Sequence, residues 1–522
     1  MLRQSGTTSI AAAAATASGL LLDVAIAARY GAGSSTDSFF AAARIPLGLV
    51  AIVMVGANQA LVPAISTWLV KRGQTETWRL ASILLCATLV LGGGIAVLCA
   101  ALAWPLMRIT APGFSAEEVN LAASLARIMF LVVPLVALAE ILRAVLNAKH
   151  SFFAPAAMNV IMNGLAAGLI LFATGVDIHV IAWAYVAGAT AQVVFMLVMA
   201  YRKGFRLRLS LAVRDAEILG TGRLMVRPLL GASLNPVARI GEQVVVSFLP
   251  PGSITILNYG YRLVSAIGGT VLFRSVMVVV LPRLTRANAN GDDKAFRSTT
   301  RLGIRILFVL SVAITVLMAI LAKPAVLGLF QRGNFTQADA EMLGWVLVIY
   351  SASVIGSGLQ RGMLAPFFGR LDTRTPLRNT AYGVVANLAL LPLFVLPLGI
   401  RDPEAVLGVA AAYSLAQYVN ALHIKRELSR DLGIRQTGIA ELILPVGLAA
   451  GVTSAVLLLG YWLLKLGQPQ ERWYLLLCTA ALGVLGLVVF AGVAGALHLP
   501  DIRRLRSDAG GQAEPSDEPS DE

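Results

Sequence analysis

Long apolar stretches recur from one end of the chain to the other, and they limit the possible fold more than any other feature. Each is close to 20 residues or longer, enough for a helix to cross a hydrocarbon core of about 30 Å. Of the 522 residues 57% are hydrophobic and 13% charged, whereas a soluble protein carries roughly a quarter charged residues. Because lipid offers a backbone no hydrogen-bond partners, the sequence predicts an all-α polytopic membrane protein.

We expect about 14 transmembrane helices. The first of them begins with an Ala-rich run but is too long and too evenly apolar for a signal peptide. The fourteen predicted spans are 8–30, 37–70, 77–104, 118–146, 152–174, 178–201, 222–249, 255–281, 297–322, 338–365, 374–399, 404–424, 438–463 and 472–498.

The net charge of +14 is distributed unevenly about these spans. Lys and Arg concentrate in every second loop, in the basic connector 202–227 and just after the last span at Arg503, Arg504 and Arg506. Positive charge collects on the cytoplasmic side of membrane proteins, so both termini are predicted to be cytoplasmic. The charge is therefore a topological signal, and we expect no nucleic acid as a partner.

The chain also repeats itself at a nearly constant distance. Matching local patterns surround Gly33 and Gly252, Pro63 and Pro282 (both 219 residues apart), Phe114 and Phe335, and Pro155 and Pro376 (both 221 apart). A repeat of six spans gives two lobes in the same orientation, related by a pseudo-two-fold axis along the membrane normal, with two C-terminal helices added. Two such halves around a midplane cavity are typical of secondary transporters.

These features predict four segments. Residues 1–220 form an N-lobe with spans 1–6 and the connector, residues 221–436 form a C-lobe with spans 7–12, and residues 437–499 hold spans 13–14. Residues 500–522 are polar and Pro-rich, which predicts a disordered cytoplasmic tail.

Catalytic and metal-binding patterns are not evident in the sequence. The cysteines Cys86, Cys99 and Cys478 lie in apolar spans without metal-ligand spacing, and the four histidines are scattered. No Walker-type phosphate loop, nucleophile elbow or pair of catalytic carboxylates is found. We therefore expect no enzyme, no metal and no cofactor, and transport driven by an ion gradient or the membrane potential.

Arginines inside the spans are the main candidates for a binding site, because each costs roughly 2.5–3.5 kcal/mol at a helix centre unless it meets a cavity or a partner. Arg262, beside Tyr259, can grip a phosphate with its forked guanidinium group. Arg44, Arg239 and Arg274 are further candidate substrate ligands, although a structural ion pair remains the alternative for each.

Acidic residues in the spans add three candidates. Asp37 shares a helix face with Arg44, but Ser35–Asp37 also fits a helix cap, and capping is the favoured interpretation. Glu242, three residues after Arg239, is its neighbour on one helix, so the two can neutralise each other. Asp23, a lone carboxylate in the first span, and Glu242 are weak candidates for coupling transport to a proton or sodium ion.

Several motifs resemble the MurJ (MviN) family of lipid II flippases, of the MOP superfamily. They lie at Gly31–Phe40, Asn58–Pro63, Leu146–Ala148, Leu329–Thr336, Leu364–Phe368 and Asp372–Pro376. The resemblance covers residues 10–430 and implies a central cavity whose arginines hold the diphosphate of an undecaprenyl-linked sugar. On this basis the second-lobe arginine is Arg262 and the acidic residue after the first span is Asp37.

The chain differs from the family at other cavity positions. The two first-span arginines correspond to Thr16 and Leu22, and the second-span arginine falls near Val50. The cationic lining is thus thinner, and Arg44, Arg239 or Arg274 would replace it from other positions.

The sequence therefore predicts a flippase in the bacterial inner (cytoplasmic) membrane that moves a polyprenyl-diphosphate-linked saccharide by alternating access. Its expected partners are this glycan lipid, membrane lipids and cell-envelope synthesis enzymes. The alternatives are a flippase for an exopolysaccharide repeat, a MATE-like exporter of small molecules, and a non-transporting scaffold that acts through its tail.

Overall fold

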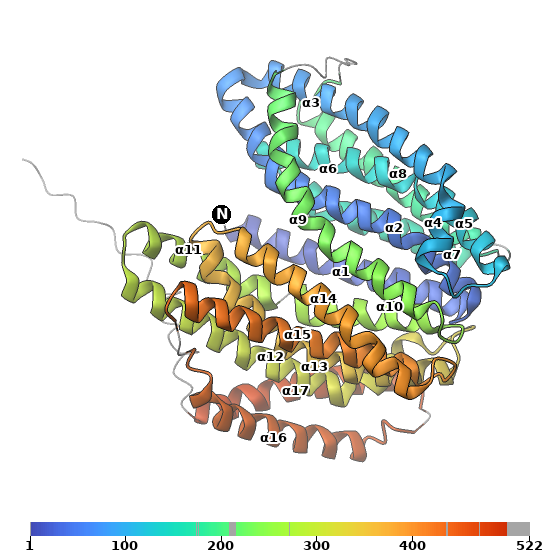
Figure 1. Cartoon of the computed structure of the whole chain (residues 1–522), viewed down its shortest axis with the longest axis vertical. Helices are drawn as coiled ribbons and strands as arrows, with labels where there is room; N and C mark the ends of the chain where they lie inside the picture. Colours follow the sequence, from blue (N-terminus) through green and yellow to red (C-terminus); the bar gives the residue numbers. More distant parts are fainter. Residues whose placement is uncertain are drawn as a thin grey trace, which may run out of the picture. The chain divides into compact units, whose positions relative to one another are not determined.

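The computed structural model describes residues 2–173, 175, 177–207, 216–270, 272–434, 437–468 and 470–497, with side chains from residue 13 onward except at 216–219, 221, 223–228, 230 and 269–275. Its regular structure over these residues is entirely helical (Figure 1). The α-helices are α1 (Leu2–Tyr30), α2 (Ser34–Gly56), α3 (Val62–Ala101), α4 (Ala103–Thr110), α5 (Ala116–Met129), α6 (Val132–Ala148), α7 (Phe153–Phe172), α8 (His179–Arg202), α9 (Ala216–Val246), α10 (Ser253–Val264), α11 (Leu272–Ala289), α12 (Asp293–Phe330), α13 (Gln337–Gly369), α14 (Arg374–Val395), α15 (Ala405–Asp431), α16 (Ala440–Leu463) and α17 (Arg472–Ala496).

An all-α polytopic membrane fold is confirmed, and a helix coincides with each of the fourteen predicted spans. Ten helical stretches among the described residues are long and apolar enough to cross a membrane, and the longest, Ser34–Ala101, covers two predicted spans. The predicted spans 8–30 and 222–249 fall on α1 and α9, and the span 255–281 falls on α10 and α11. Helices α1, α9 and α11 include residues outside the described side chains.

The predicted loop between the second and third spans is not a loop. Helix α3 runs through residues 71–76 and is interrupted only at Gly73, whose φ of 76° and ψ of 177° are not helical. Glycine reaches a positive φ at little cost because it has no Cβ. The polar run at 71–76 had suggested a loop between the spans 37–70 and 77–104. Instead, Gly73 alone interrupts the helix between them.

Each repeat contains a short π-helical segment in its second span, Ala57–Leu61 and Ser265–Thr270 respectively. Such segments occur often at functional sites, because the wider turn frees backbone groups and bends the helix. The similarity between the repeats thus extends to an irregularity of the helices.

Two compact units divide the chain by its contacts. The first contains Met1–Leu263, Leu329–Val346 and Val384–Tyr413, and the second contains Val264–Gly328, Leu347–Gly383 and Ser414–Glu522. This is a different division from the predicted lobe boundaries at residues 220 and 436, which stay a prediction.

Each unit has its own apolar core. In the first, Ile65 and Trp68 of α3 pack with Leu142 of α6. In the second, Leu284 of α11 packs with Ile424 of α15. The residues of these cores are nearly or fully buried, as expected where helices pack with interior density.

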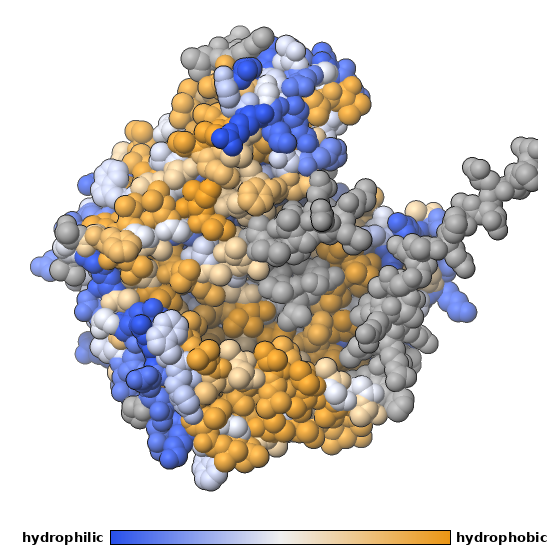
Figure 2. Space-filling view, turned by 180° about the vertical axis from the view of Figure 1, so that it is seen from behind, coloured by the Kyte–Doolittle hydropathy of each residue, from blue (hydrophilic) through white to orange (hydrophobic). Residues whose placement is uncertain are grey.

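Large apolar side chains also cover much of the surface, as the face in Figure 2 shows. On α16 and α17 they include Leu444 (73% exposed), Trp462 (73%) and Leu477 (70%). Monomeric soluble proteins rarely expose contiguous apolar patches of this kind. These helices are therefore suited to contact with lipid.

Candidate substrate-binding site

The candidate site centres on an ion pair between α1 and α10, both in the first unit. Nη1 of Arg262 donates to Oδ1 of Asp23. The Arg262 side chain is 30% exposed, whereas that of Asp23 is 2% exposed. The Tyr185 side chain of α8 interacts with the same guanidinium group.

This pairing explains how both charges are tolerated inside an apolar bundle. A buried carboxylate without a partner is strongly destabilising, and the guanidinium group supplies the compensating charge. Arg262 has five N–H donors in a planar fork and almost a third of its side chain is accessible. An anion can therefore reach the arginine without Asp23 first leaving its place.

Tyr259 lies three residues before Arg262 but is fully buried. Its ring packs against Phe40 of α2, Phe330 at the end of α12, and Phe335, with ring centroids 5.4, 5.3 and 6.1 Å away. Its hydroxyl has no hydrogen-bond partner among the described residues. The predicted contact of Tyr259 with substrate stays a prediction; the structure places its ring in an aromatic cluster.

Asp37 caps a helix, but not its own. The N-terminus of α2 is capped at Gly33 by the Thr36 side chain. Asp37, only 4% exposed, instead accepts hydrogen bonds from the backbone N–H groups of Gly252 (2.7 Å) and Thr255 (2.8 Å) and from the Thr255 hydroxyl (2.6 Å). The expectation that it caps its own helix was wrong, because Thr36 already occupies that position; its contact with substrate stays a prediction.

Arg44 and Arg239 lie elsewhere in the first unit. The Nε of Arg44 donates to Oε1 of Gln243 at 3.0 Å, which connects α2 to α9. Arg239 pairs with Glu242 at 2.9 Å, as their spacing predicted. The Arg239 guanidinium also lies 3.2 Å from the ring centroid of Tyr261.

The structure thus brings together Arg262 and Asp23, which sequence reasoning treated separately. It places Arg239 and Glu242 together with Tyr261, and the side chain of Arg274 lies outside those described. Tyr185 was missed, because a tyrosine in an apolar span carries no distinguishing signal. Gln243 was detectable as a second polar residue beside Glu242 in an apolar stretch.

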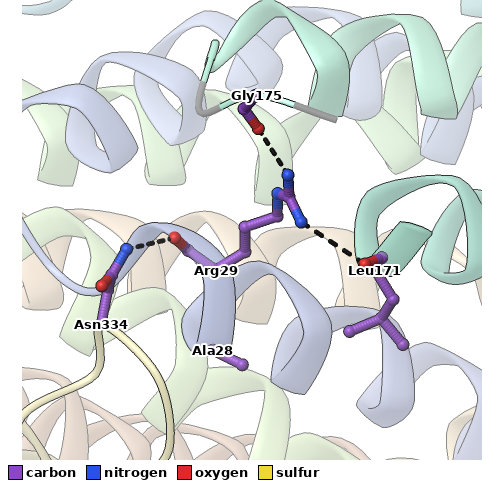
Figure 3. A pocket seen from close by; sticks show the side chains of 5 residues that line it. All are labelled: Ala28, Arg29, Leu171, Gly175 and Asn334. Atoms are coloured by element: carbon purple, nitrogen blue, oxygen red, sulfur yellow. Dashed lines mark hydrogen bonds between the residues drawn. The ribbon is translucent and has the colours of Figure 1, made fainter. Parts of the chain in front are cut away.

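A shallow pocket of about 460 Å³ lies at the opposite end of α1 from the N-terminus, lined by Ala28, Arg29, Leu171, Gly175 and Asn334 (Figure 3). The Arg29 guanidinium donates to the carbonyl oxygens of Leu171 at 3.4 Å, Gly175 at 2.5 Å, and Ala173. A cation at the C-terminus of a helix satisfies carbonyl groups that lack donors. Arg29 thereby caps α7, and the Asn334 side chain donates to the Arg29 carbonyl oxygen at 2.5 Å.

A family profile described as "Lipid II flippase MurJ" matches residues 26–496. The chain belongs to the MurJ family. Its sequence relatives include "Probable lipid II flippase MurJ" of Vibrio cholerae, 28% identical over 442 residues, which are 78% of this chain and 79% of the relative. The corresponding protein of Rhizobium meliloti is 26% identical over 520 residues, 93% and 92% of the two chains. "Lipid II flippase MurJ" of Burkholderia cenocepacia is 24% identical over 491 residues, 91% and 87%.

Solved structures show the same fold. "Lipid II flippase MurJ, inward closed conformation" superposes with a TM-score of 0.75 at 20% identity, covering 96% of this chain and 99% of that one. An inward-facing MATE transporter of the MOP superfamily gives a TM-score of 0.67 at 16% identity, covering 80% and 94%. The MurJ resemblance predicted from the motifs is confirmed by the family profile, and the MATE transporter shows the same fold.

Proposed function

We propose that this chain translocates a polyprenyl-diphosphate-linked saccharide, lipid II in the first instance, across the bacterial inner membrane by alternating access, with both termini in the cytoplasm. The observation that carries the proposal is the Arg262 side chain, 30% exposed and paired with the buried Asp23. Membership of a lipid II flippase family supports the substrate class. Binding and release of the lipid require no covalent chemistry by this chain.

Arg262 is proposed to bind the diphosphate. A diphosphate offers more negative charge and more acceptor oxygens than one carboxylate, and a guanidinium fork binds such oxygens in bidentate fashion. The arginine then shifts from Asp23 toward the substrate, and the same exchange in reverse releases the lipid. Asp23 thus keeps the empty site neutral and pre-orients the arginine.

The same exchange offers a route for energy coupling. When Arg262 turns to the diphosphate, Asp23 loses its compensating charge while it remains buried, so binding of a proton or a sodium ion becomes favourable. Glu242 suits this role less well, because its partner Arg239 is on the same helix and their pairing does not depend on movement between helices. We therefore assign coupling to Asp23, driven by an ion gradient or the membrane potential.

A second glycan substrate also merits a test, because fewer arginines are expected to line the binding cavity than in the family. With Thr16, Leu22 and Val50 at positions where the family carries arginines, a substrate of different headgroup, such as an exopolysaccharide repeat, is the runner-up. The MATE-like exporter is less favoured, since its support is a fold similarity at 16% identity.

The test is rescue of bacteria depleted of their own lipid II flippase. We expect the full chain to restore growth and the appearance of lipid II headgroups on the outer leaflet. A chain that accumulates in the membrane but does not rescue, while it restores export in cells lacking an exopolysaccharide flippase, would move the substrate to that glycan. Failure in both assays would contradict the flippase proposal.

Deleting residues 500–522 separates transport from scaffolding. A transporter whose work is done by its helices is expected to retain rescue within about two-fold of the full chain, measured as growth rate at matched expression. Loss of rescue with headgroup translocation intact would instead support recruitment of cell-envelope enzymes by the tail.

A further inference from the structure

Two loops that correspond in the repeats make the same kind of contact in the first unit. The backbone N–H of Asn334, between α12 and α13, donates to the carbonyl oxygen of Ala28 near the end of α1 at 2.8 Å. The backbone N–H of Gly113, between α4 and α5, donates to Oγ of Ser247 just after the end of α9 at 3.0 Å. In each case a loop lies on the end of a helix from the other repeat.

The repeat offsets relate these two contacts to each other. Adding 219 to 28 gives 247, and adding 221 to 113 gives 334, so each partner in one contact is the repeat counterpart of a partner in the other. Exchange of the two repeats converts one contact into the other. That is the pattern of two equivalent contacts around a two-fold axis.

A third contact marks where this axis passes. Phe40 and Tyr259 are also repeat counterparts, 219 residues apart, and their rings meet edge to face with centroids 5.4 Å apart. Residues that contact their own counterparts lie on a two-fold axis. Phe335, next to Asn334, extends the same aromatic cluster, since its ring lies 6.1 Å from that of Tyr259.

Both loops press closely on the helix ends. A Cβ at Gly113 would overlap the backbone of Ser247, and a Cβ at Gly333, whose φ is +56°, would overlap the Ala28 carbonyl group. The contact at α1 carries an additional hydrogen bond from the Asn334 side chain to the Arg29 carbonyl oxygen (Figure 3). The two contacts are therefore equivalent in position but differ in chemistry.

These two hydrogen bonds suit a contact that forms and breaks repeatedly. The Ala28 carbonyl group belongs to the last turn of α1, where carbonyl groups lack intrahelical donors. Water can replace the loop N–H as the partner of this oxygen and of the Ser247 hydroxyl. Because protein and water hydrogen bonds exchange at a net change of only about 0.5–1.5 kcal/mol each, breaking them does not trap the protein in one state. The Tyr259 ring of the aromatic cluster is fully buried.

We propose that these two contacts, named here the α1 latch (Asn334 on Ala28 and Arg29) and the α9 latch (Gly113 on Ser247), are one gate present in duplicate. Together they close the transport path on the side proposed to face outward, and they open as a pair around the Phe40–Tyr259 contact when the headgroup leaves. The inference rests on the proposed function for its direction of transport, but its central claim, coupled opening, does not.

Hydrogen–deuterium exchange of the purified full chain tests the coupling without substrate. Ser247→Ala removes the acceptor of the α9 latch only. We expect it to accelerate exchange of the amides in 111–115 and also those in 331–336, each by about two- to ten-fold, the factor that one net hydrogen bond represents. Asn334→Ala, or Gly333→Ala where the remaining backbone bond masks the effect, is expected to accelerate exchange in both segments too.

Gly168→Ala on α7 is the matched control, since no atom lies within 4 Å of its added Cβ; we expect unchanged exchange in both segments. Acceleration confined to the mutated latch, or none in either, would overturn the proposal. Because this measurement needs no transport, it can fail while rescue succeeds, and it can succeed while rescue fails. Failure of the gate and failure of the flippase proposal are thus distinguishable.

Discussion

Arg262→Ala is expected to abolish rescue of flippase-depleted cells, whereas Arg127→Ala, at an exposed position on α5, retains it. Two hydrogen bonds from a charged donor contribute roughly 1.5–3 kcal/mol each, so loss of the fork weakens diphosphate binding by at least about 100-fold. Arg262→Lys keeps the charge but not the bidentate geometry. We expect it to support growth far less well than the original arginine.

The single alanine variant also leaves Asp23 buried without a counter-charge, which costs about 3–5 kcal/mol of stability. The double variant Asp23→Asn with Arg262→Ala removes both charges and separates the two effects. We expect it to accumulate and unfold near the temperature of the original chain, yet fail to rescue. Rescue by this well-folded double variant would show that Arg262 is not the diphosphate ligand.

The spans and the repeat could be predicted because both depend on the chain alone. A bilayer requires about 20 apolar residues wherever a helix crosses it, and a duplicated gene keeps its offsets whatever the fold. Pairs on one helix are equally accessible to sequence reasoning: Arg239 and Glu242, three residues apart, are paired as predicted.

Contacts between helices could not be predicted in the same way. Asp23 and Arg262 are 239 positions apart, and nothing local to either residue identifies the other. Intramembrane charge indicated that each needs a partner, but not which one. The energetic cost of a buried charge therefore indicated that Asp23 and Arg262 each need a partner. Only the fold, which brings α1 next to α10, shows that they are partners of each other.

Asp37 shows how a local pattern can mislead. Ser, Thr and Asp before an apolar run are typical helix caps, and the run Ser35–Asp37 contains all three. Thr36 and the Gly33 backbone satisfy α2, so Asp37 is available to bind Gly252 and Thr255, more than 200 residues away. The residue type was informative; its partner was decided by the fold.

Asp37→Ala is expected to destabilise the chain by about 3 kcal/mol or more, because three buried donors at the N-terminus of α10, on Gly252 and Thr255, lose their acceptor at roughly 1–3 kcal/mol each. The measurement is the unfolding temperature of the purified protein in detergent. Asp37→Asn keeps one acceptor oxygen, so we expect its unfolding temperature to lie between those of the original chain and Asp37→Ala. The matched control is Asp177→Ala, because Asp177 likewise accepts from a helix N-terminus, that of α8 at His179, but with a side chain 68% exposed.

The backbone hydrogen bond from His179, followed by that from its side chain, lowers the pKa of the Asp177 carboxyl. Its contribution is complete above the ordinary aspartate range and is lost as the pH falls through the lowered pKa. At neutral pH the Asp177 carboxylate therefore makes its full contribution to stability, and Asp177→Ala removes all of it. We still expect Asp177→Ala to lower the unfolding temperature much less than Asp37→Ala does.

Asp37 also connects α2 to α10, which are the second spans of the two repeats, on the same side as the two latches. Its loss should therefore loosen the gate as well as the fold, and exchange in segments 111–115 and 331–336 should accelerate in Asp37→Ala. An unchanged unfolding temperature would show that another acceptor, such as water, replaces the Asp37 carboxylate as the partner of these donors at the start of α10. Unchanged exchange with a lowered unfolding temperature would confine Asp37 to holding α10 in place.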